Sequence, residues 1–338
     1  MFSNLWILSA NNRKLSHNSL VLAFLIIIAT SGMALSNAIS NSSNNNQVQA
    51  QQQVRQTKIN KLWETPDDLK NPESVLYAPK QNVLFVSNVD GKPDQKDQKG
   101  FISKVSSSNG SIIELNWITG LNAPKGMAIS NNNNSKLYVS DITDLVEIDI
   151  NNGKIIKRLN AQGSTFLNDV AADTQGNIYV SDTGTNTLYK LDTNIKDNNT
   201  SLEVWLQSPE LNDPNGLHVD NNKNRLIVAS LGDMSKPGAG MKVVDLMNKT
   251  ISSLGKEGTT SPFGGLDGIE SDANETHYYV TDNPAGKVYT VNADGTGYRT
   301  LIDLKTQGAA DLGFIPGQSI IIIPLMQDNK LVAYKLVE

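Results

Sequence analysis

A short motif recurs six times along the chain and constrains the fold more than any other feature. Each copy begins with a polar residue and leads into a run typical of a β-strand. The copies are ESVLYA from Glu73, KGMAIS from Lys125, NDVAAD from Asn168, NGLHVD from Asn215, DGIESD from Asp267 and DLGFIP from Asp311. They start 43 to 52 residues apart. Strands disfavour Asn and Asp, so a polar residue that returns at this place belongs to the repeat itself.

Further strands follow within each copy at similar offsets. The second is rich in β-branched and aromatic residues, as in KLYVSD, NIYVSD and HYYVTD, and the third reads FISKV, LYKLD or VYTVN. Turns rich in Asn and Gly separate them, and most copies have a fourth strand. A period of about 40 to 50 residues is typical of one β-propeller blade. The sequence therefore predicts an all-β fold, a six-bladed β-propeller over residues 58–338.

The sixth copy ends too early to have a fourth strand, because Glu338 follows directly after its third. An unpaired edge strand invites aggregation, and propellers leave only short, protected edges. The segment KINKLWE, residues 58–64, precedes the first copy and alternates imperfectly between apolar and polar residues. We predict that this N-terminal strand closes the last blade.

The residues before the propeller have the pattern of an export signal. Arg13 and Lys14 precede an apolar run at residues 20–29, and the small residues SNA occupy 36–38. The run is shorter than the roughly 20 residues that span a bilayer, so residues 1–38 are interpreted as a signal peptide or an uncleaved membrane anchor. Residues 39–57 are a low-complexity polar tether. Both alternatives predict a secreted or extracytoplasmic propeller, with a membrane contact only if the segment is retained.

Composition excludes several classes of function. The net charge is only −5 and no basic cluster with stacking aromatics is evident, which argues against nucleic acid binding. The chain has no cysteine, so it has no disulfide, no catalytic thiol and no zinc–thiolate site. No Ser, His and Asp arrangement for nucleophilic catalysis can be assembled.

The polar residues that open the copies are expected to converge. In a propeller the first strand of each blade is the innermost, so these residues stand at the mouth of the central channel: Glu73, Lys125, Asn168, Asn215, Asp267 and Asp311. Three carboxylates and one ammonium give a formal charge of −2. Carboxylates in a partly dry channel need a cation, a proton or a hydrogen-bonded partner. Oxygen ligands of this kind suit calcium, although such a ring can also hold ordered water.

At these residues the chain resembles the family of senescence marker protein (regucalcin) and gluconolactonase, which are six-bladed propellers. The resemblance rests on PES with Glu73, ND with Asn168, PNG with Asn215 and LDG with Asp267, and it covers nearly all of residues 70–338. It implies one divalent metal, usually calcium, held by these four residues. It also implies that Asp267 is the catalytic general base and that the substrate is a lactone or related ester.

Non-catalytic propellers of the NHL type also use PNG and YVSD blades. The alternative is therefore an interaction module that engages a cell-surface protein or glycan. Metal content does not separate the two hypotheses, whereas turnover does.

Two residues depart from the family pattern. Regucalcin-like sugar lactonases carry an Arg two residues before the Asn of the third blade, and this chain has Phe166 there. We therefore expect a less polar lactone or ester, in a substrate pocket formed by Lys125, Phe166, Phe263 and Asp311. Lys125 places a cation in the ring, where it either lowers calcium affinity or takes the place of the metal by pairing with the carboxylates.

Other polar residues are interpreted as structural. Asp141, Asp182 and Asp282 end second strands and are expected to bond to turn amides. His218 and His277 are assigned to packing or to the surface.

Overall fold

The computed structural model describes residues 57–130, 135–195, 201–233, 238–255 and 261–337. The predicted signal or anchor, residues 1–38, lies outside these ranges, as does the predicted tether except for its last residue. Both stay predictions. Within the described ranges, no helix has the length and apolar character needed to cross a membrane.

The described chain forms six antiparallel sheets of four strands each. The innermost strands are β2 (Pro72–Ala78), β6 (Pro124–Ile129), β10 (Leu167–Ala172), β14 (Pro214–Asp220), β18 (Leu266–Ser271) and β22 (Gly313–Ile315). The second strands are β3 (Val83–Asn88), β7 (Lys136–Asp141), β11 (Asn177–Asp182), β15 (Arg225–Ser230), β19 (His277–Asp282) and β23 (Ile320–Leu325). The third strands are β4 (Gly100–Ser106), β8 (Asp144–Asp149), β12 (Thr187–Asp192), β16 (Gly240–Asp245), β20 (Lys287–Asn292) and β24 (Lys330–Val337). The outermost strands are β5 (Ile112–Leu121), β9 (Lys154–Asn160), β13 (Glu203–Gln207), β17 (Ile251–Ser253), β21 (Arg299–Asp303) and β1 (Lys58–Glu64).

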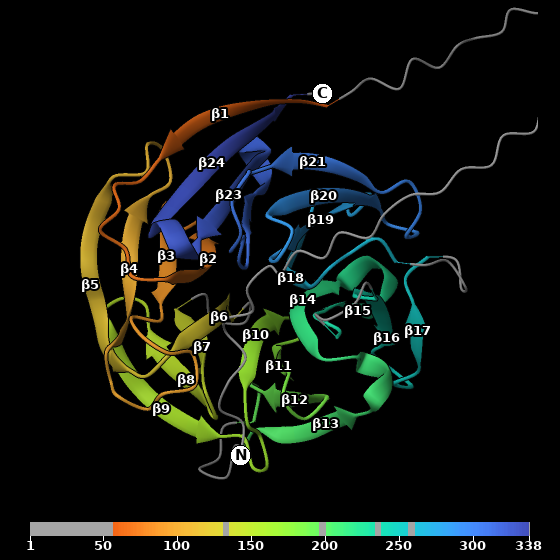
Figure 1. Ribbon diagram of the computed structural model, residues 1–338. Helices are drawn as coiled ribbons and strands as arrows, with labels where there is room; N and C mark the ends of the chain where they lie inside the picture. The colour runs from red at the N-terminus through yellow and green to blue at the C-terminus, as the bar shows by residue number, and fades with distance from the viewer. Residues whose placement is uncertain (1–56, 131–134, 196–200, 234–237, 256–260, 338) are drawn as a thin grey trace, which may run out of the picture. The chain divides into compact units, whose positions relative to one another are not determined.

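The innermost strands contact one another in a closed cycle, β2 with β6, then β10, β14, β18, β22 and again β2. Figure 1 shows the corresponding arrangement, with the six sheets around a common centre. Four short 3₁₀ turns complete the described elements, at Pro209–Leu211, Asn221–Lys223, Pro316–Gln318 and Met326–Asp328. The architecture is a six-bladed β-propeller, as the repeats predict.

The outermost strand of the sixth sheet comes from the N-terminal side of the domain. β1 pairs antiparallel with β24, from Lys58 opposite Val337 to Glu64 opposite Val332. Thr65 extends the contact, because its N–H donates to the Leu331 carbonyl and its hydroxyl accepts from the Leu331 N–H, both at 3.0 Å. The first and last segments of the domain therefore share one blade (Figure 1).

The core lies between neighbouring blades. Phe85 and Ile102 of the first sheet pack with Leu137 and Val146 of the second, and the other clusters join neighbours in the same way. Both faces of a blade are thus covered, which is why every residue of β11 is buried and the second strands are so rich in apolar and aromatic residues. An outermost strand such as β9 has no fully buried residue and is correspondingly polar.

Candidate functional site

Each of the first five innermost strands has a bulge where the repeat begins. In β10, Leu167 pairs with Asp182 and Val170 pairs with Val180, so β10 has one residue more than β11 over this stretch. β2, β6, β14 and β18 have a register shift at the same place. A bulge takes a side chain out of the alternation of the sheet and re-aims it. A polar residue can therefore open a strand here without a place in the packed ladder.

The loop before each bulge is held by the last residue of the second strand. Asp182 accepts hydrogen bonds from the backbone N–H groups of Thr165 and Phe166, both at 3.0 Å. Asp282 accepts from the backbone at residues 264–265 in the same way. These aspartates fix the path of the chain as it enters the channel mouth.

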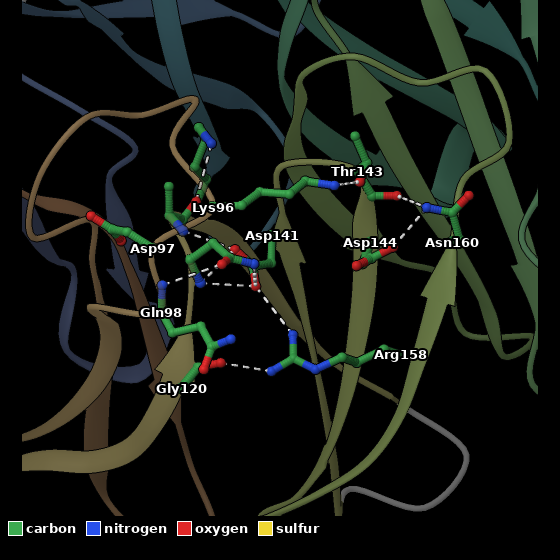
Figure 2. A network of polar contacts seen from close by, with 12 residues as sticks. Lys96, Asp97, Gln98, Gly120, Asp141, Thr143, Asp144, Arg158 and Asn160 are labelled. Atoms are coloured by element: carbon green, nitrogen blue, oxygen red, sulfur yellow. Dashed lines mark hydrogen bonds and ion pairs between the residues drawn. The ribbon is translucent and has the colours of Figure 1, made fainter.

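Asp141 has the same function in the second blade. Its carboxylate accepts from the N–H groups of Asn122 at 3.0 Å and Ala123 at 2.8 Å. Arg158 also donates to it, and the second guanidinium nitrogen of Arg158 reaches the Gly120 carbonyl at 2.8 Å (Figure 2). The prediction that the aspartates at the ends of second strands bond to turn amides is confirmed.

The sixth copy is aligned incorrectly in the sequence analysis, by one residue. Gly313 pairs with Ile322, and Ala309 bridges to Leu325, the last residue of β23. In the other copies the residue opposite that last position immediately precedes the candidate, as Leu167 precedes Asn168. Ala310, and not Asp311, therefore occupies the candidate position of the sixth blade. Asp311 therefore lies one residue further along its strand than Asp267 does.

The corrected register defines two layers of side chains. The first layer contains Glu73, Lys125, Asn168, Asn215, Asp267 and Ala310. The second layer is one residue further along each strand and contains Ser74, Gly126, Asp169, Gly216, Gly268 and Asp311. The five polar residues of the first layer are each at most 7% exposed. Buried polar groups are normally hydrogen-bonded, so any polar atom of this layer that has no partner needs an explanation.

Two carboxylate oxygens of the first layer are buried without a hydrogen-bond partner, Oε2 of Glu73 and Oδ1 of Asp267. Burial raises the pKa of Glu73 well above its ordinary value; the Asp267 carboxylate raises it further and the Lys125 ammonium opposes the shift. Burial also raises the pKa of Asp267, to about 6, against hydrogen bonds from Asn283 and Asn215. The two acids thus lie close enough to affect each other, and each has an unsatisfied oxygen.

Lys125 is only 2% exposed, and its ammonium is bonded mainly to neutral groups. Nζ donates to the carbonyl oxygens of Pro93 and Ala123, both at 3.1 Å. It also lies 4.4 Å from the ring centroid of Phe166, the geometry of a cation–π contact. Burial lowers the pKa of Lys125, while the Glu73 carboxylate raises it. The ammonium therefore has partners of its own, so its presence does not depend on a direct bond to a first-layer carboxylate.

The loop at residues 89–99 supplies one of these partners. It connects β3 to β4 and carries Pro93 toward the second blade. Lys96 anchors it there, because Nζ donates to the Thr143 hydroxyl at 2.8 Å (Figure 2). This loop explains the deep burial of Lys125, a residue type that is rarely fully buried.

The two predicted pocket phenylalanines have different surroundings. Phe166 is half-buried and contacts Lys125. Phe263 packs edge-on against Tyr289 and Tyr298, with ring centroids 5.0 and 5.6 Å away. It lines a cavity of about 610 Å³ together with Met241, and none of the described residues that line this cavity belongs to the first or second layer. Phe263 therefore lines a cavity to which Phe166 does not contribute.

The second layer contains a carboxylate that the sequence analysis missed. Asp169 accepts from the N–H groups of Val170 and Leu217, both at 2.6 Å. Burial raises its pKa to about 8, although these hydrogen bonds lower it. Asp311 lies in the same layer in the sixth blade and accepts from the Ser74 hydroxyl at 2.6 Å. The sequence does mark Asp169 as unusual, because three other copies have glycine at the equivalent position.

Burial also raises the pKa of Asp311 well above its ordinary value, and Asp169 raises it further. With Glu73 and Asp267, four carboxylates therefore interact at the mouth, against the single ammonium of Lys125. Their formal charges sum to −3.

The donor set fits a hard cation. Among the described residues, no three His, Cys, Asp or Glu side chains gather as a metal-binding group. The four residues implied by the family resemblance contain only two acids, and the other two donors are the carboxamides of Asn168 and Asn215. Carboxylate and amide oxygens are the ligands that calcium takes. The unpartnered oxygens of Glu73 and Asp267 are where such an ion would be needed.

No family model matches the sequence, and no curated protein is similar enough in sequence to match. Among solved structures, a gluconolactonase from Xanthomonas campestris, described as important in glucose secondary metabolic pathways, matches with a TM-score of 0.61. The chain shares the fold of that gluconolactonase. Sequence identity is 14%, and the match covers 83% of this chain and 90% of the other. At this identity the likeness concerns the fold, which confirms the six-bladed propeller.

Proposed function

We propose that this protein is a calcium-dependent hydrolase of a lactone or related ester. The observation that carries the proposal is the pair of buried, unpartnered carboxylate oxygens, Glu73 Oε2 and Asp267 Oδ1, on neighbouring acids at one channel mouth. Leaving a buried charged oxygen unsatisfied costs stability unless a ligand compensates. The gluconolactonase with the same fold supports the choice of reaction class.

Four residues would hold the ion: Glu73, Asn168, Asn215 and Asp267. Two carboxylates and two neutral amides leave open positions on a cation that takes six to eight oxygens. When bound, calcium would polarise a substrate carbonyl oxygen and stabilise negative charge on it.

Asp267 is the proposed general base. Its Oδ2 accepts a hydrogen bond from Asn283 at 2.8 Å, and its Oδ1, which would face the ion, has a second lone pair that could accept a proton from an attacking water. The hydrogen bonds from Asn283 and Asn215 favour the ionised form of Asp267 against its burial. The carboxylate is thereby kept available as a base close to neutral pH.

The proposed substrate is less polar than a sugar lactone. Phe166 offers no directed donor to a polyhydroxylated ring, and a sugar hydroxyl buried there without a partner would cost about 1 to 3 kcal/mol. The ammonium of Lys125 already lies over this ring. An alkyl or aryl lactone or ester has no sugar hydroxyls that need hydrogen-bond partners in the site.

We also propose that the propeller acts outside the cytoplasm. The support is the charged, apolar and small-residue pattern of residues 1–38 and the polar tether that follows.

A hydrolysis screen tests the proposal. Residues 39–338 are assayed against gluconolactone, alkyl and aryl lactones and aryl esters, with calcium or with a chelator. We expect calcium-dependent turnover, highest on an alkyl or aryl substrate and lost in Asp267→Ala. Asp67→Ala removes an exposed aspartate and serves as the matched control. Absence of calcium-dependent turnover on every substrate would overturn the enzyme and favour the cell-surface interaction module.

A further inference from the structure

The residue that directly follows each second strand differs in character between the blades. In four blades it is apolar: Val89, Ile142, Leu231 and Met326. In the third and fifth blades it is polar, Thr183 after β11 and Asn283 after β19. These are also the blades in which Asn168 and Asp267 stand in the first layer. Each of the two polar residues bonds to the first-layer side chain of its own blade.

Thr183 fixes the orientation of the Asn168 amide. Asn168 Nδ2 donates to Thr183 Oγ1 at 3.1 Å, and Thr183 Oγ1 donates to the Pro214 carbonyl at 2.7 Å. A threonine hydroxyl has one proton. Because that proton is committed to Pro214, the hydroxyl can only accept from Asn168. The amide must then present its NH₂ group to Thr183, which leaves Oδ1 on the other side, free for another partner.

Asn283 has the matching effect on Asp267. Its Nδ2 donates to Asp267 Oδ2 at 2.8 Å. Its own backbone is held at both ends, since its N–H donates to the Gly265 carbonyl at 3.0 Å and its carbonyl accepts from Gly308 at 3.1 Å and Gly286 at 3.3 Å. A donor this well anchored selects one carboxylate oxygen of Asp267 and leaves the other, Oδ1, buried and unpartnered.

We infer that Thr183 and Asn283 are positioning residues that preset one oxygen of Asn168 and one of Asp267 for a calcium ion. The inference rests on the proposed calcium-dependent function and adds which residues tune it. Outer partners orient metal ligands, and their loss typically lowers metal affinity by about 10- to 100-fold. Without Thr183 the Asn168 amide is free to turn its NH₂ toward the ion. Without Asn283 the Asp267 carboxylate is free to rotate.

Calcium binding by purified full-length protein tests the inference. Isothermal titration calorimetry gives the Kd for calcium, and thermal melting with and without calcium gives the ligand-dependent shift in Tm. The variants are Thr183→Val, which keeps shape and removes the hydroxyl, Thr183→Ser, which keeps the hydroxyl, and Asn283→Leu. We expect Kd to rise about 10- to 100-fold in Thr183→Val and Asn283→Leu, and to return close to wild type in Thr183→Ser.

Two control variants separate positioning from general destabilisation. Thr187→Val removes a buried hydroxyl of the same blade that bonds to Thr185. Asn177→Leu removes a buried Asn–Asp hydrogen bond, to Asp173 at 2.6 Å, at the opposite end of β11. Both should lower the Tm of the metal-free protein and leave the calcium Kd unchanged.

The outcomes are distinct. A wild-type Kd in Thr183→Val and Asn283→Leu, with calcium bound normally by the wild type, overturns the positioning roles and leaves the proposed function standing. An equal rise of Kd in the two control variants also overturns them. No calcium binding by the wild-type protein at millimolar concentration overturns both the proposed calcium site and this inference.

Discussion

The ammonium of Lys125 lies 4.4 Å from the centroid of the Phe166 ring, so the second and third blades meet at the channel mouth through a cation–π contact. The contact is desolvated on the lysine side, because Lys125 is 2% exposed. Phe166, which stands where the resemblance implies an arginine, is thus in contact with a buried cation, so a change at either residue should affect the other.

Replacement of Phe166 should therefore destabilise the protein in a charge-dependent way. Phe166→Leu should lower the free energy of unfolding by about 0.5 to 2 kcal/mol, the range of a cation–π contact. Phe166→Arg should lower it more, because a guanidinium would stand beside the Lys125 ammonium. Lys125→Met in the Phe166→Arg background should recover part of the difference. Urea unfolding measures all three, and equal stability of Phe166→Leu and Phe166→Arg would contradict the arrangement.

Calcium should raise the melting temperature of the wild-type protein. Asp267→Ala removes one ligand and one of the two unpartnered oxygens, so it should abolish this calcium-dependent rise while the propeller stays folded. Asp67→Ala, at an exposed site, should retain the full rise. Differential scanning calorimetry with calcium and with chelator measures the effect. If the shift survives in Asp267→Ala, the ion binds elsewhere.

The metal-free protein should lose stability as the pH rises. Burial raises the folded-state pKa of Asp267 from 3.8 to about 6 and that of Asp169 to about 8. The folded state therefore binds these protons more tightly than the unfolded chain. The resulting stabilisation is complete below about pH 4 and is lost as the pH rises through 6 and then 8. Melting of dialysed, metal-free protein should give a lower Tm at pH 8 than at pH 5, and the opposite order would show that the carboxylates are solvated or paired.

The pKa of Asp220, the last residue of β14, is shifted in the opposite direction, so this residue provides a contrast. Burial alone would raise the pKa of Asp220, but hydrogen bonds, among them those from Lys223 and Arg225, hold it below its ordinary value. Asp220 is therefore ionised in both states between pH 5 and 8 and adds no slope there. Its contribution is lost only at more acidic pH, as the carboxylate becomes protonated.

Removal of β1 should expose an edge of the last blade. Deletion of residues 1–57 leaves β1 intact and should yield a soluble domain that unfolds cooperatively. Deletion of residues 1–66 removes β1 and Thr65, leaves the outer edge of β24 unpaired, and should cause aggregation. Light scattering and thermal melting compare the two. Equal solubility and stability would mean that the β1–β24 pairing contributes little.

The architecture and most of the first layer could be predicted because the repeat carries both. Five residues each open a copy: Glu73, Lys125, Asn168, Asn215 and Asp267. The copies lie so far apart in the sequence that an alignment error of a few residues does not move a residue to another blade. Asp311 could not be placed, because β22 has only three paired residues and a shift of one leaves its apolar pattern acceptable. Hydrogen-bond pairing, which the sequence does not display, settles that register.

Asp169, Thr183 and Asn283 were not identified from the sequence, for a different reason. Periodicity finds residues that share a position, whereas Asp169 differs from the glycines of three other copies. Thr183 and Asn283 likewise stand where the other blades have apolar residues. Their importance comes from a bond to one particular neighbour, which depends on distance and not on composition. Export and the metal remain predictions.

We expect the pairing of β1 with β24 to form late in folding. The first strand of the domain to be synthesised finds its partner only when the last strand has been made, and contacts so distant in sequence form slowly. Until then the sixth blade, which lies between the fifth and the first, lacks its outermost strand. Glu73 and Asp267 come from the first and fifth blades. We therefore expect cation binding to follow ring closure. Calcium would then stabilise the closed propeller and would not help to nucleate its folding.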